Sequence, residues 1–232
     1  MRYQRLEALI GKEQVTFLRH KSVLIFGLGG VGSFAVEALA RSGIGKLILV
    51  DPDQIEMTNI NRQLLALTST MGRMKTEVMA DRIREIDPTT EVITYPIKLT
   101  PDTVGQFLLL DPDWIVDAID DIPAKLCLIE ACMIRKSRFI SSMGFANKIQ
   151  PECVQIAQMH DTKMCPMSKS VRHELNKRHI SLDFPVVYSS EKPSLSMDSQ
   201  VRLASTAFVP SVAGLMMASV VIRSLIGWED QT

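Results

Sequence analysis

A short glycine-rich segment constrains this chain more than any other feature. In VLIFGLGGVGS, the residues Gly27, Gly29 and Gly32 have the spacing G-x-G-x-x-G between an apolar run and a helical stretch. Such glycines allow a tight turn, let phosphate oxygens approach the backbone, and leave room for close helix packing. The amino terminus of the helix adds partial positive charge. The segment therefore predicts a strand, turn and helix that bind the phosphates of a nucleotide.

The segment belongs to a longer alternation of strands and helices. Apolar or β-branched runs alternate with helical stretches from residue 21 to residue 142, which is typical of βαβ units around a parallel sheet. The predicted strands are 22–26, 47–50, 92–95, 114–118 and 139–142, and the predicted helices are 31–41, 75–86, 102–109 and 124–135. We therefore expect the α/β class, with a Rossmann-like, mostly parallel sheet and helices on both faces.

The regular alternation ends after Ser142. Residues 144–158 indicate a strand-rich excursion, residues 169–177 a helix, and residues 188–198, which include Ser190, Pro193 and Ser196, a flexible or ligand-gated loop. We expect a nucleotide-binding core over residues 1–142 and a small C-terminal lobe with a closing helix over residues 143–232. A chain of 232 residues can bury one large core with an appended lobe, so both parts are expected to form one domain overall.

The last apolar stretch raises the question of a membrane. Residues 207–228 are apolar except for small hydroxyl residues and Arg223, and their length approaches that of a bilayer span. Pro210, Gly214 and the interior Arg223 disfavour a spanning helix, and the small residues suit close packing. We expect a buried helix; membrane association without a true span is the weaker alternative.

Composition narrows the classes of partner. Lysine plus arginine and aspartate plus glutamate number 26 each, so no net charge draws the chain to DNA or to a membrane surface, although a local patch can still bind RNA. The first residues have no secretory signal pattern, and the four cysteines suggest neither a disulfide framework nor a C-x-x-C zinc site. We expect a cytoplasmic protein that has no DNA partner.

A carboxylate follows the second predicted strand. Asp51 lies 19 residues after Gly32, where its side chain can accept hydrogen bonds from ribose hydroxyls. The glycine spacing and this aspartate are together typical of NAD-dependent dehydrogenases, and a structural turn without a ligand is the plainer alternative. The residues after Asp51 decide between these interpretations.

The segment after Asp51, DPDQIEMTNINRQ, is rich in groups that bind phosphates. Arg62 and, further on, Lys75 are cations that can hold a triphosphate. Asn59 and Gln63 are neutral groups that can hydrogen-bond ribose and phosphate edges. Isolated basic residues are more often solvated, but a nicotinamide site has no use for this set. The segment therefore favours ATP over a nicotinamide cofactor.

Two acids complete the set. Asp120 and Asp121 follow the fourth predicted strand in WIVDAIDD. Ligands of open α/β sheets bind outside the carboxyl ends of the strands, so these acids are expected in the nucleotide crevice, where Asp120 can hold Mg²⁺ on the phosphates. In-line attack of a carboxylate on the α-phosphate needs cations on the tail phosphates and no protein nucleophile. We expect an adenylate-forming enzyme whose catalytic residues are Arg62, Lys75 and Asp120.

The motifs GLGGVGS, VDPDQIEMTNINRQ, Lys75 and VDAIDD resemble, in this order, the ubiquitin-activating (E1-like) superfamily, which includes sulfur-carrier adenylyltransferases. The resemblance covers roughly residues 3–142 and rests on several independent motifs. It implies a nucleotide site made of Gly27, Gly29, Gly30, Gly32, Asp51, Asn59, Arg62, Gln63, Lys75, Asp120 and Asp121.

The second half resembles one branch of that superfamily. SSMGFANKIQPE, CPMSKSVRHELNKR and VVYSSEKP are similar to segments of the bacterial tRNA threonylcarbamoyladenosine dehydratases. The resemblance implies that ATP activates the carboxylate of the threonylcarbamoyl group at position 37 of certain tRNAs. An internal nucleophile of the same modification then displaces AMP, and the modification cyclises with loss of water. The chain departs from the branch in lacking paired C-x-x-C ligands and in having Cys165 where many relatives have an aspartate before Pro166.

The same resemblance implies partners. It implies tRNA as the substrate, a homodimer, and Mg²⁺ bound with ATP, and it leaves open a monovalent cation (Na⁺ or K⁺) and a sulfur-relay or cysteine desulfurase system. Lys169, Arg172, His173 and Lys177 fall at helical spacings and predict a basic stripe that can contact tRNA phosphates, with a solvated helix face as the plain alternative.

Other functions stay open at this point. The first rival is a sulfur-carrier adenylyltransferase that activates the C-terminus of a small ubiquitin-like protein. A nicotinamide dehydrogenase and a non-catalytic nucleotide sensor are the others. A thioester on Cys153 or Cys165 is also conceivable, but no evident base flanks either residue, so a buried or incidental thiol is the favoured interpretation.

Overall fold

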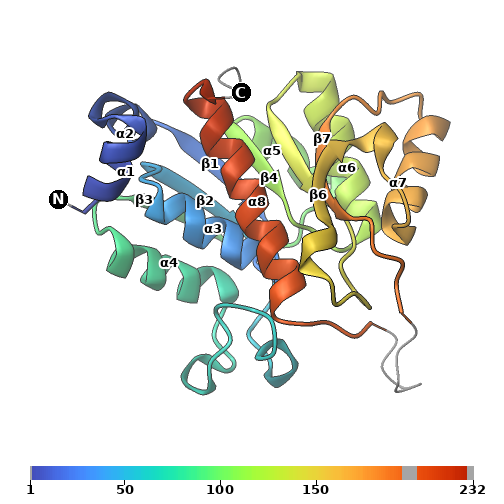
Figure 1. The fold of residues 1–232 in the computed structure, drawn as a ribbon, viewed down its shortest axis with the longest axis horizontal. Coiled ribbons are helices and arrows are strands. Elements are labelled where there is room, and N and C mark those ends of the chain that lie inside the picture. The colour runs from blue at the N-terminus through green and yellow to red at the C-terminus, as the bar shows by residue number, and fades with distance from the viewer. Residues whose placement is uncertain (1, 195–202, 229–232) are drawn as a thin grey trace.

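A seven-stranded sheet runs through the molecule (Figure 1). The computed structural model of the chain describes residues 2–194 and 203–228. The strands are β1 Ser22–Phe26, β2 Lys46–Val50, β3 Glu91–Tyr95, β4 Trp114–Asp117, β5 Phe139–Ser142, β6 Val154–Gln158 and β7 Pro185–Ser189. They lie in the order β3-β2-β1-β4-β5-β7-β6, and every pair is parallel except β6 with β7. The order reverses direction between β1 and β4, which is where open α/β sheets bind their ligands.

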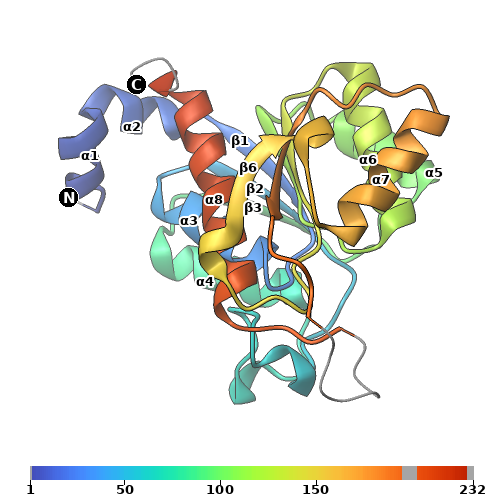
Figure 2. The same ribbon diagram turned by 45° about the vertical axis from the view of Figure 1, so that its right-hand side comes forward.

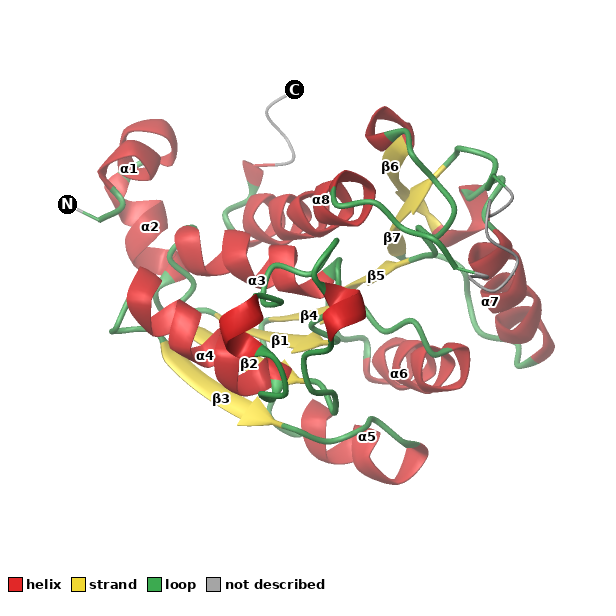
Figure 3. Ribbon diagram, turned by 90° about the horizontal axis from the view of Figure 1, so that it is seen from below, coloured by secondary structure: helices red, strands yellow, loops and turns green. Residues whose placement is uncertain are grey.

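Helices cover both faces of this sheet (Figure 3). The α-helices are α1 Gln4–Ile10, α2 Lys12–Leu18, α3 Gly32–Arg41, α4 Lys75–Ile86, α5 Pro101–Leu108, α6 Ile122–Arg135, α7 Pro166–Lys177 and α8 Phe208–Leu225. The 3₁₀ helices are η1 Met57–Asn59, η2 Thr68–Thr70, η3 Pro151–Cys153 and η4 Met159–Asp161. One face is covered by α3, α4 and α8, and the other by α5, α6 and α7. The arrangement confirms the predicted α/β class.

Successive side chains of each strand point to opposite faces, which gives the sheet two apolar layers. In β1, Val23 and Ile25 pack in the layer under α3 and α8, whereas Leu24 and Phe26 pack in the layer of α5 and α6. Phe26 meets Phe107 of α5 edge-on, with ring centroids 5.3 Å apart. Burial on both faces explains why this strand is a continuous apolar run in the sequence.

The C-terminal region continues the same sheet. β5 pairs in parallel with β7, so residues on both sides of position 142 share one sheet. Tyr188 and Ser189 belong to β7, which corrects the predicted loop: it begins only at Ser190, and its residues 195–198 lie outside the described part of the chain. The antiparallel pairing with β6 decides this, because Gln155 and Val154 of β6 pair with Tyr188 and Ser189, which the sequence pattern alone assigns to a loop.

The apolar C-terminal helix α8 lies along α3 (Figures 1 and 2). Among the described residues it is the one helix that is long and apolar enough to cross a membrane, and half of that stretch is buried inside the protein. A Cβ at Gly214 would lie 2.2 Å from the carbonyl oxygen of Val31, so a side chain at this position would push the two helices apart. The glycine thus allows α8 to pack directly over the start of α3.

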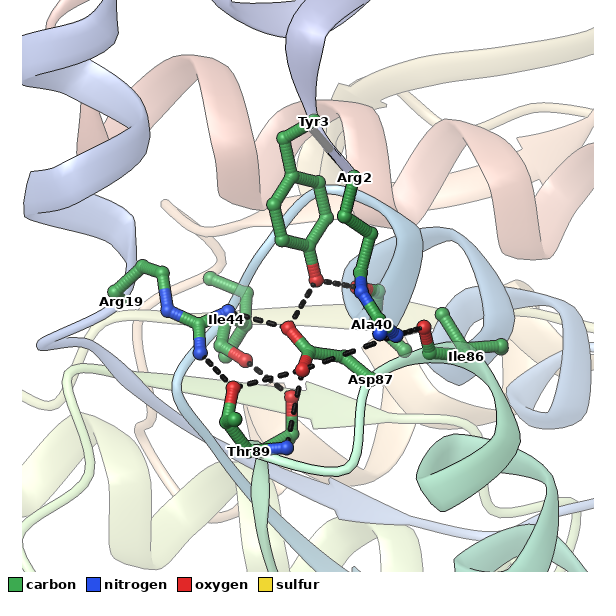
Figure 4. Close-up of polar contacts among 9 residues, drawn as sticks. Arg2, Tyr3, Arg19, Ala40, Ile44, Ile86, Asp87 and Thr89 are labelled. Carbon is green, nitrogen blue, oxygen red and sulfur yellow. Dashed lines mark hydrogen bonds and ion pairs between the residues drawn. The ribbon is translucent and has the colours of Figure 1, made fainter.

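Two short helices at the amino terminus, α1 and α2, were absent from the predicted elements. Leu6, Leu9 and Ile10 of α1 have helical spacing, but the helix has only seven residues and none of them is fully buried, so its pattern is weak. These helices are fastened to the body through Asp87, at the end of α4 (Figure 4). Its carboxylate accepts hydrogen bonds from the hydroxyl of Tyr3 at 2.7 Å and from the guanidinium of Arg19 at 2.5 Å.

The environment of Asp87 keeps its carboxylate ionised. Burial opposes ionisation, but hydrogen bonds from Thr89, Tyr3 and Arg19 outweigh burial and hold the pKa of Asp87 below its ordinary range. The hydroxyl and the amide of Thr89 both donate to the same carboxylate, at 2.7 and 3.0 Å. Burial, and then the hydrogen bond to Asp87 and its negative charge, raise the pKa of Tyr3 to about 12. The link therefore joins an anion to neutral and cationic donors at neutral pH.

Candidate functional site

The glycine-rich turn lies between β1 and α3, at the carboxyl edge of the sheet. Gly27 has φ of 87°, a conformation that side chains rarely adopt, and a Cβ there would lie 2.6 Å from the carbonyl oxygen of Ala118. A Cβ at Gly32 would lie 1.8 Å from the carbonyl oxygen of Gly27. Both glycines are therefore required by the backbone, which brings the turn against the loop that follows β4.

The start of α3 is suited to an anion. Val31 precedes the helix and makes no side-chain capping hydrogen bond, so the start of α3 is uncapped. Gln63 lies over the turn: its Nε2 is 3.8 Å from the place of a Cβ on Gly29. Its buried Oε1 has no hydrogen-bond partner among the residues that the structure describes. A buried amide oxygen without a donor is costly, so the site fits a ligand that brings a hydroxyl or amino group.

Asp51 joins the ends of β1 and β2. It is 3% exposed, and its carboxylate accepts the amide of Leu28 at 2.6 Å and the amide of Asp53 at 2.9 Å. Lys75, which begins α4, places its Nζ 2.7 Å from Asp53 Oδ2 and 3.9 Å from Asp51 Oδ1. Burial raises the pKa of Asp51, and the lysine and the two amides oppose that rise. The structure thus brings Asp51 and Lys75 together under the glycine-rich turn.

Arg62 and Asn59 lie in the segment between β2 and α4, which projects below the sheet in Figure 1. Arg62 is half-buried, and a Cβ at Gly30 would lie 3.4 Å from its Cγ, so its stem passes beside the turn. Its guanidinium donates to the carbonyl of Thr58 at 2.8 Å. Asn59 is buried, and its Oδ1 accepts the amide of Glu56, so this side chain shapes η1. Arg62 and Asn59 therefore both belong to one segment that runs beside the glycine-rich turn.

The two predicted acids occupy different environments. Asp120 is exposed in the loop after β4. Asp121 caps α6, because its Oδ1 accepts the amide of Ala124 at 3.0 Å, and its Oδ2 lies 4.0 Å from Nζ of Lys98. No group of three or more His, Cys, Asp or Glu residues in the described chain could hold a metal by itself. A Mg²⁺ ion at this edge would therefore need ligands from nucleotide phosphates as well as from the protein.

A buried polar cluster beneath this loop was missed by the sequence analysis. Lys125 of α6 places its Nζ 2.7 Å from Asp117 Oδ2 and 3.1 Å from the hydroxyl of Ser141, and all three residues are fully buried. Burial lowers the pKa of Lys125, and the charge of Asp117 opposes that shift. The sequence signal that could have indicated this cluster is the single lysine, Lys125, in the mostly apolar run IPAKLCLIEAC.

The predicted basic stripe lies on α7. This helix is far from the glycine-rich turn in the sequence and packs on the opposite face of the sheet from α3. Lys169, His173 and Lys177 are exposed, at spacings of four residues. Arg172 turns inward instead and donates to the carbonyl of Thr162 at 2.6 Å. Its guanidinium therefore has a structural role that the spacing alone does not indicate.

The two cysteines of the second half make different contacts. Cys165 is buried, and its Sγ lies 3.7 Å from the carbonyl of Gly144. Cys153 is half-buried, with its Sγ 3.2 Å from Oε1 of Gln150. Neither thiol contacts a histidine or a carboxylate in these hydrogen bonds, which gives no support to thioester chemistry.

These features are those of a nucleotide-binding α/β protein, and they gather at the carboxyl edge of the sheet beside β1, β2 and β4. Comparison with known proteins identifies the family: the chain matches the ThiF family over residues 3–232 and belongs to it.

Two relatives that each match 97% of this chain are both named tRNA threonylcarbamoyladenosine dehydratase. A tRNA threonylcarbamoyladenosine dehydratase of Bacillus subtilis (strain 168) is 42% identical over 239 residues, which cover 97% of this chain and 94% of that protein. The solved structure of Escherichia coli tRNA N6-threonylcarbamoyladenosine dehydratase in complex with ATP has a TM-score of 0.92 at 29% identity, over 98% of this chain and 94% of that one. An adenylyltransferase and sulfurtransferase of Aedes aegypti is 35% identical over 142 residues, 60% of this chain and 32% of that protein.

Proposed function

We propose that this chain catalyses the ATP-dependent dehydration of N6-threonylcarbamoyladenosine in tRNA to its cyclic form. The observation that carries the proposal is the nucleotide cradle, in which the uncapped start of α3, the Asp51 carboxylate and the buried, unpartnered Oε1 of Gln63 meet at one edge of the sheet. Relatives named for this activity, at 42% and 33% identity over 97% of the chain, support it.

The reaction has two steps. A carboxylate oxygen of the threonylcarbamoyl group bonds to the α-phosphorus of ATP, and the bond from that phosphorus to the pyrophosphate breaks. An internal nucleophile of the same group then bonds to the activated acyl carbon, and AMP leaves. One water is removed from the modified nucleoside, and ATP becomes AMP and pyrophosphate. Neither step needs a protein nucleophile, so catalysis rests on orientation and charge.

Each residue of the cradle has a role in this scheme. The amides at the start of α3 receive phosphate oxygens, and Asp51 accepts the ribose hydroxyls next to the amide of Leu28. Arg62 and Lys75 neutralise the phosphates that leave as pyrophosphate. Asp120 would hold Mg²⁺ together with ATP, and the ion would offset charge on the same phosphates. Asn59 and Gln63 contribute neutral hydrogen bonds.

Several finer points belong to the same proposal. We propose that the enzyme is a homodimer, which the molar mass in solution tests, and that it acts in the cytoplasm. Its tRNA contacts include the exposed basic residues of α7. A monovalent cation and a sulfur-relay partner stay predictions of the sequence.

The central experiment measures the product. Purified protein is incubated with ATP, Mg²⁺ and tRNA that contains the linear modification, and the nucleosides are analysed by mass spectrometry after mild digestion. We expect the cyclic nucleoside and one AMP for each cyclisation. Replacing Arg62, Lys75 or Asp120 by alanine should lower kcat at least about 100-fold, because each removes charge that stabilises the leaving phosphates.

A matched control lies in the same segment. Arg73→Ala removes an exposed cation that pairs with Asp81 at 2.7 Å, and turnover should stay within about twofold of wild type. Pyrophosphate exchange that depends on a ubiquitin-like carrier protein, with no turnover of tRNA, would instead assign the chain to the sulfur-carrier adenylyltransferases. Tight binding of NADH without binding of ATP would reject both.

A further inference from the structure

An ion pair without access to water lies directly under the loop that carries Asp120. Asp117 ends β4, Lys125 lies in the first turns of α6, and Ser141 lies in β5. Both members of the pair have side chains that are 0% exposed. The hydroxyl of Ser141 donates to Asp117 Oδ2 at 2.5 Å and accepts from Lys125 Nζ at 3.1 Å. Three neighbouring elements thus meet in one closed polar cluster.

The cluster also holds the backbone of the loop. The second oxygen of Asp117 accepts the amide of Ile119 at 3.1 Å, one residue before Asp120. The amide of Ala118 donates to the carbonyl of Phe26 at 2.8 Å, which ties the loop to β1. On the other side, Asp121 caps α6 through the amide of Ala124. Every neighbour of Asp120 is therefore fixed by a bond to the cluster, to β1 or to α6.

The loop in turn contacts the phosphate-binding turn. The carbonyl oxygen of Ala118 lies 2.6 Å from the place of a Cβ on Gly27, so the two backbones are in contact. A shift of the loop would therefore move Asp120 and change its distance from a nucleotide bound at the turn.

Stability alone does not account for such a cluster. Apolar side chains of similar volume often stabilise a core at least as well as a buried ion pair, because both charges lose their hydration. An ion pair does, however, fix geometry, since it tolerates few arrangements in which both charges are satisfied. This pair lies between the sheet and the loop that carries Asp120. A fixed geometry at this place therefore affects the reaction.

We propose that Asp117, Lys125 and Ser141 are positioning residues, which hold the loop of residues 118–121 so that Asp120 faces the phosphates of ATP. The inference rests on the proposed function, since Asp120 acts on those phosphates only in an adenylating enzyme. The cluster touches no substrate; it acts on the reaction through the loop.

The test removes both charges together. The double variant Asp117→Leu with Lys125→Met leaves no uncompensated buried charge and takes away the oxygen that accepts the Ile119 amide. We expect kcat to fall about 100-fold, while the Kd for AMP, which lacks the departing phosphates, stays within about threefold. Hydrogen exchange of a peptide that covers residues 118–121 should become at least about tenfold faster.

Ser141→Ala is the second variant and keeps the ion pair, so it serves if the double variant does not fold. It should lower kcat about tenfold and leave AMP binding unchanged. The control is Lys98→Met, which removes an exposed lysine 4.0 Å from Asp121 and should change neither kcat nor loop exchange.

Three results would overturn the inference: wild-type kcat in a folded double variant or in Ser141→Ala, a loss of AMP affinity as large as the loss of kcat, or loop exchange that stays unchanged in the variants. Loop exchange and AMP affinity are measured without tRNA. An inactive wild type with tRNA would therefore reject the proposed function, whereas unchanged loop exchange in the variants would reject only the role of the cluster.

Discussion

Asp87 shows how one side chain can determine the pH dependence of stability. Its folded-state pKa is below the value of about 3.9 for an unfolded aspartate, so its bonds contribute fully above that value and are lost as the pH falls through the folded pKa. We predict that Asp87→Asn lowers the free energy of unfolding by about 2 kcal/mol at pH 7. Urea unfolding at several pH values measures this.

The pH series also provides the check. The difference between Asp87→Asn and wild type should shrink as the pH falls below about 4, because the carboxylate of the unfolded wild type then binds a proton while the folded one stays ionised until the pH passes its lowered pKa. The control is Asp81→Asn, an exposed aspartate that pairs with Arg73 and Arg84, and it should cost less than about 1 kcal/mol. A difference that does not depend on pH would mean that Asp87 stabilises the fold by shape and not by charge.

At the scale of elements, the contact between α3 and α8 links the C-terminal helix to nucleotide binding. Gly214→Ala places a methyl group 2.2 Å from the carbonyl oxygen of Val31, at the start of the helix α3, which we propose receives phosphates. We predict a loss of about 2 kcal/mol in unfolding free energy and weaker ATP binding, because the helices must separate. Thermal unfolding and calorimetric titration with ATP measure the two effects.

The chain offers a matched control for this substitution. Gly105 lies inside α5, and a Cβ there meets no atom within 4 Å. Gly105→Ala should therefore leave ATP binding unchanged and raise stability by up to about 1 kcal/mol, since alanine favours the helix. Equal stability of the two alanine variants would show that α8 adjusts its position at no cost.

At the scale of the whole molecule, the question is how a chain without net charge holds tRNA. We predict that charge reversal at Lys169 and Lys177 together weakens tRNA binding about tenfold and reduces the dependence of log Kd on log salt by about 2. Arg172 is left intact, because its guanidinium is bonded within the protein. Fluorescence anisotropy over a range of salt concentrations measures both quantities.

The control reverses two exposed lysines on other helices and turns, Lys12 and Lys136. This variant has the same net charge as the first, so a local contact affects only the α7 variant, whereas a general field affects both. Unchanged affinity in the α7 variant would remove that surface from the proposed tRNA site.

The sequence by itself determined the central strands, the turn at Gly27 and the place of Asp51 at the end of β2. Each of these follows from a pattern within a few residues, because a strand buried on both faces needs a continuous apolar run and a phosphate-binding turn needs glycines at fixed spacing. The same local signals indicated Arg62, Lys75 and Asp120 as site residues, and the structure places Asp51 and Lys75 in contact at 3.9 Å.

Only the tertiary structure decided which distant residues meet. The ion pair of Asp117 with Lys125 is completed by Ser141 from another strand, and Asp87 meets Tyr3 across 84 positions of the chain. The strand β7 likewise depends on β5, and the inward turn of Arg172 depends on Thr162, ten positions away, from a segment outside its own helix. Local patterns report the preferences of short segments, whereas the bonds of a buried polar group depend on which segments the fold brings beside it.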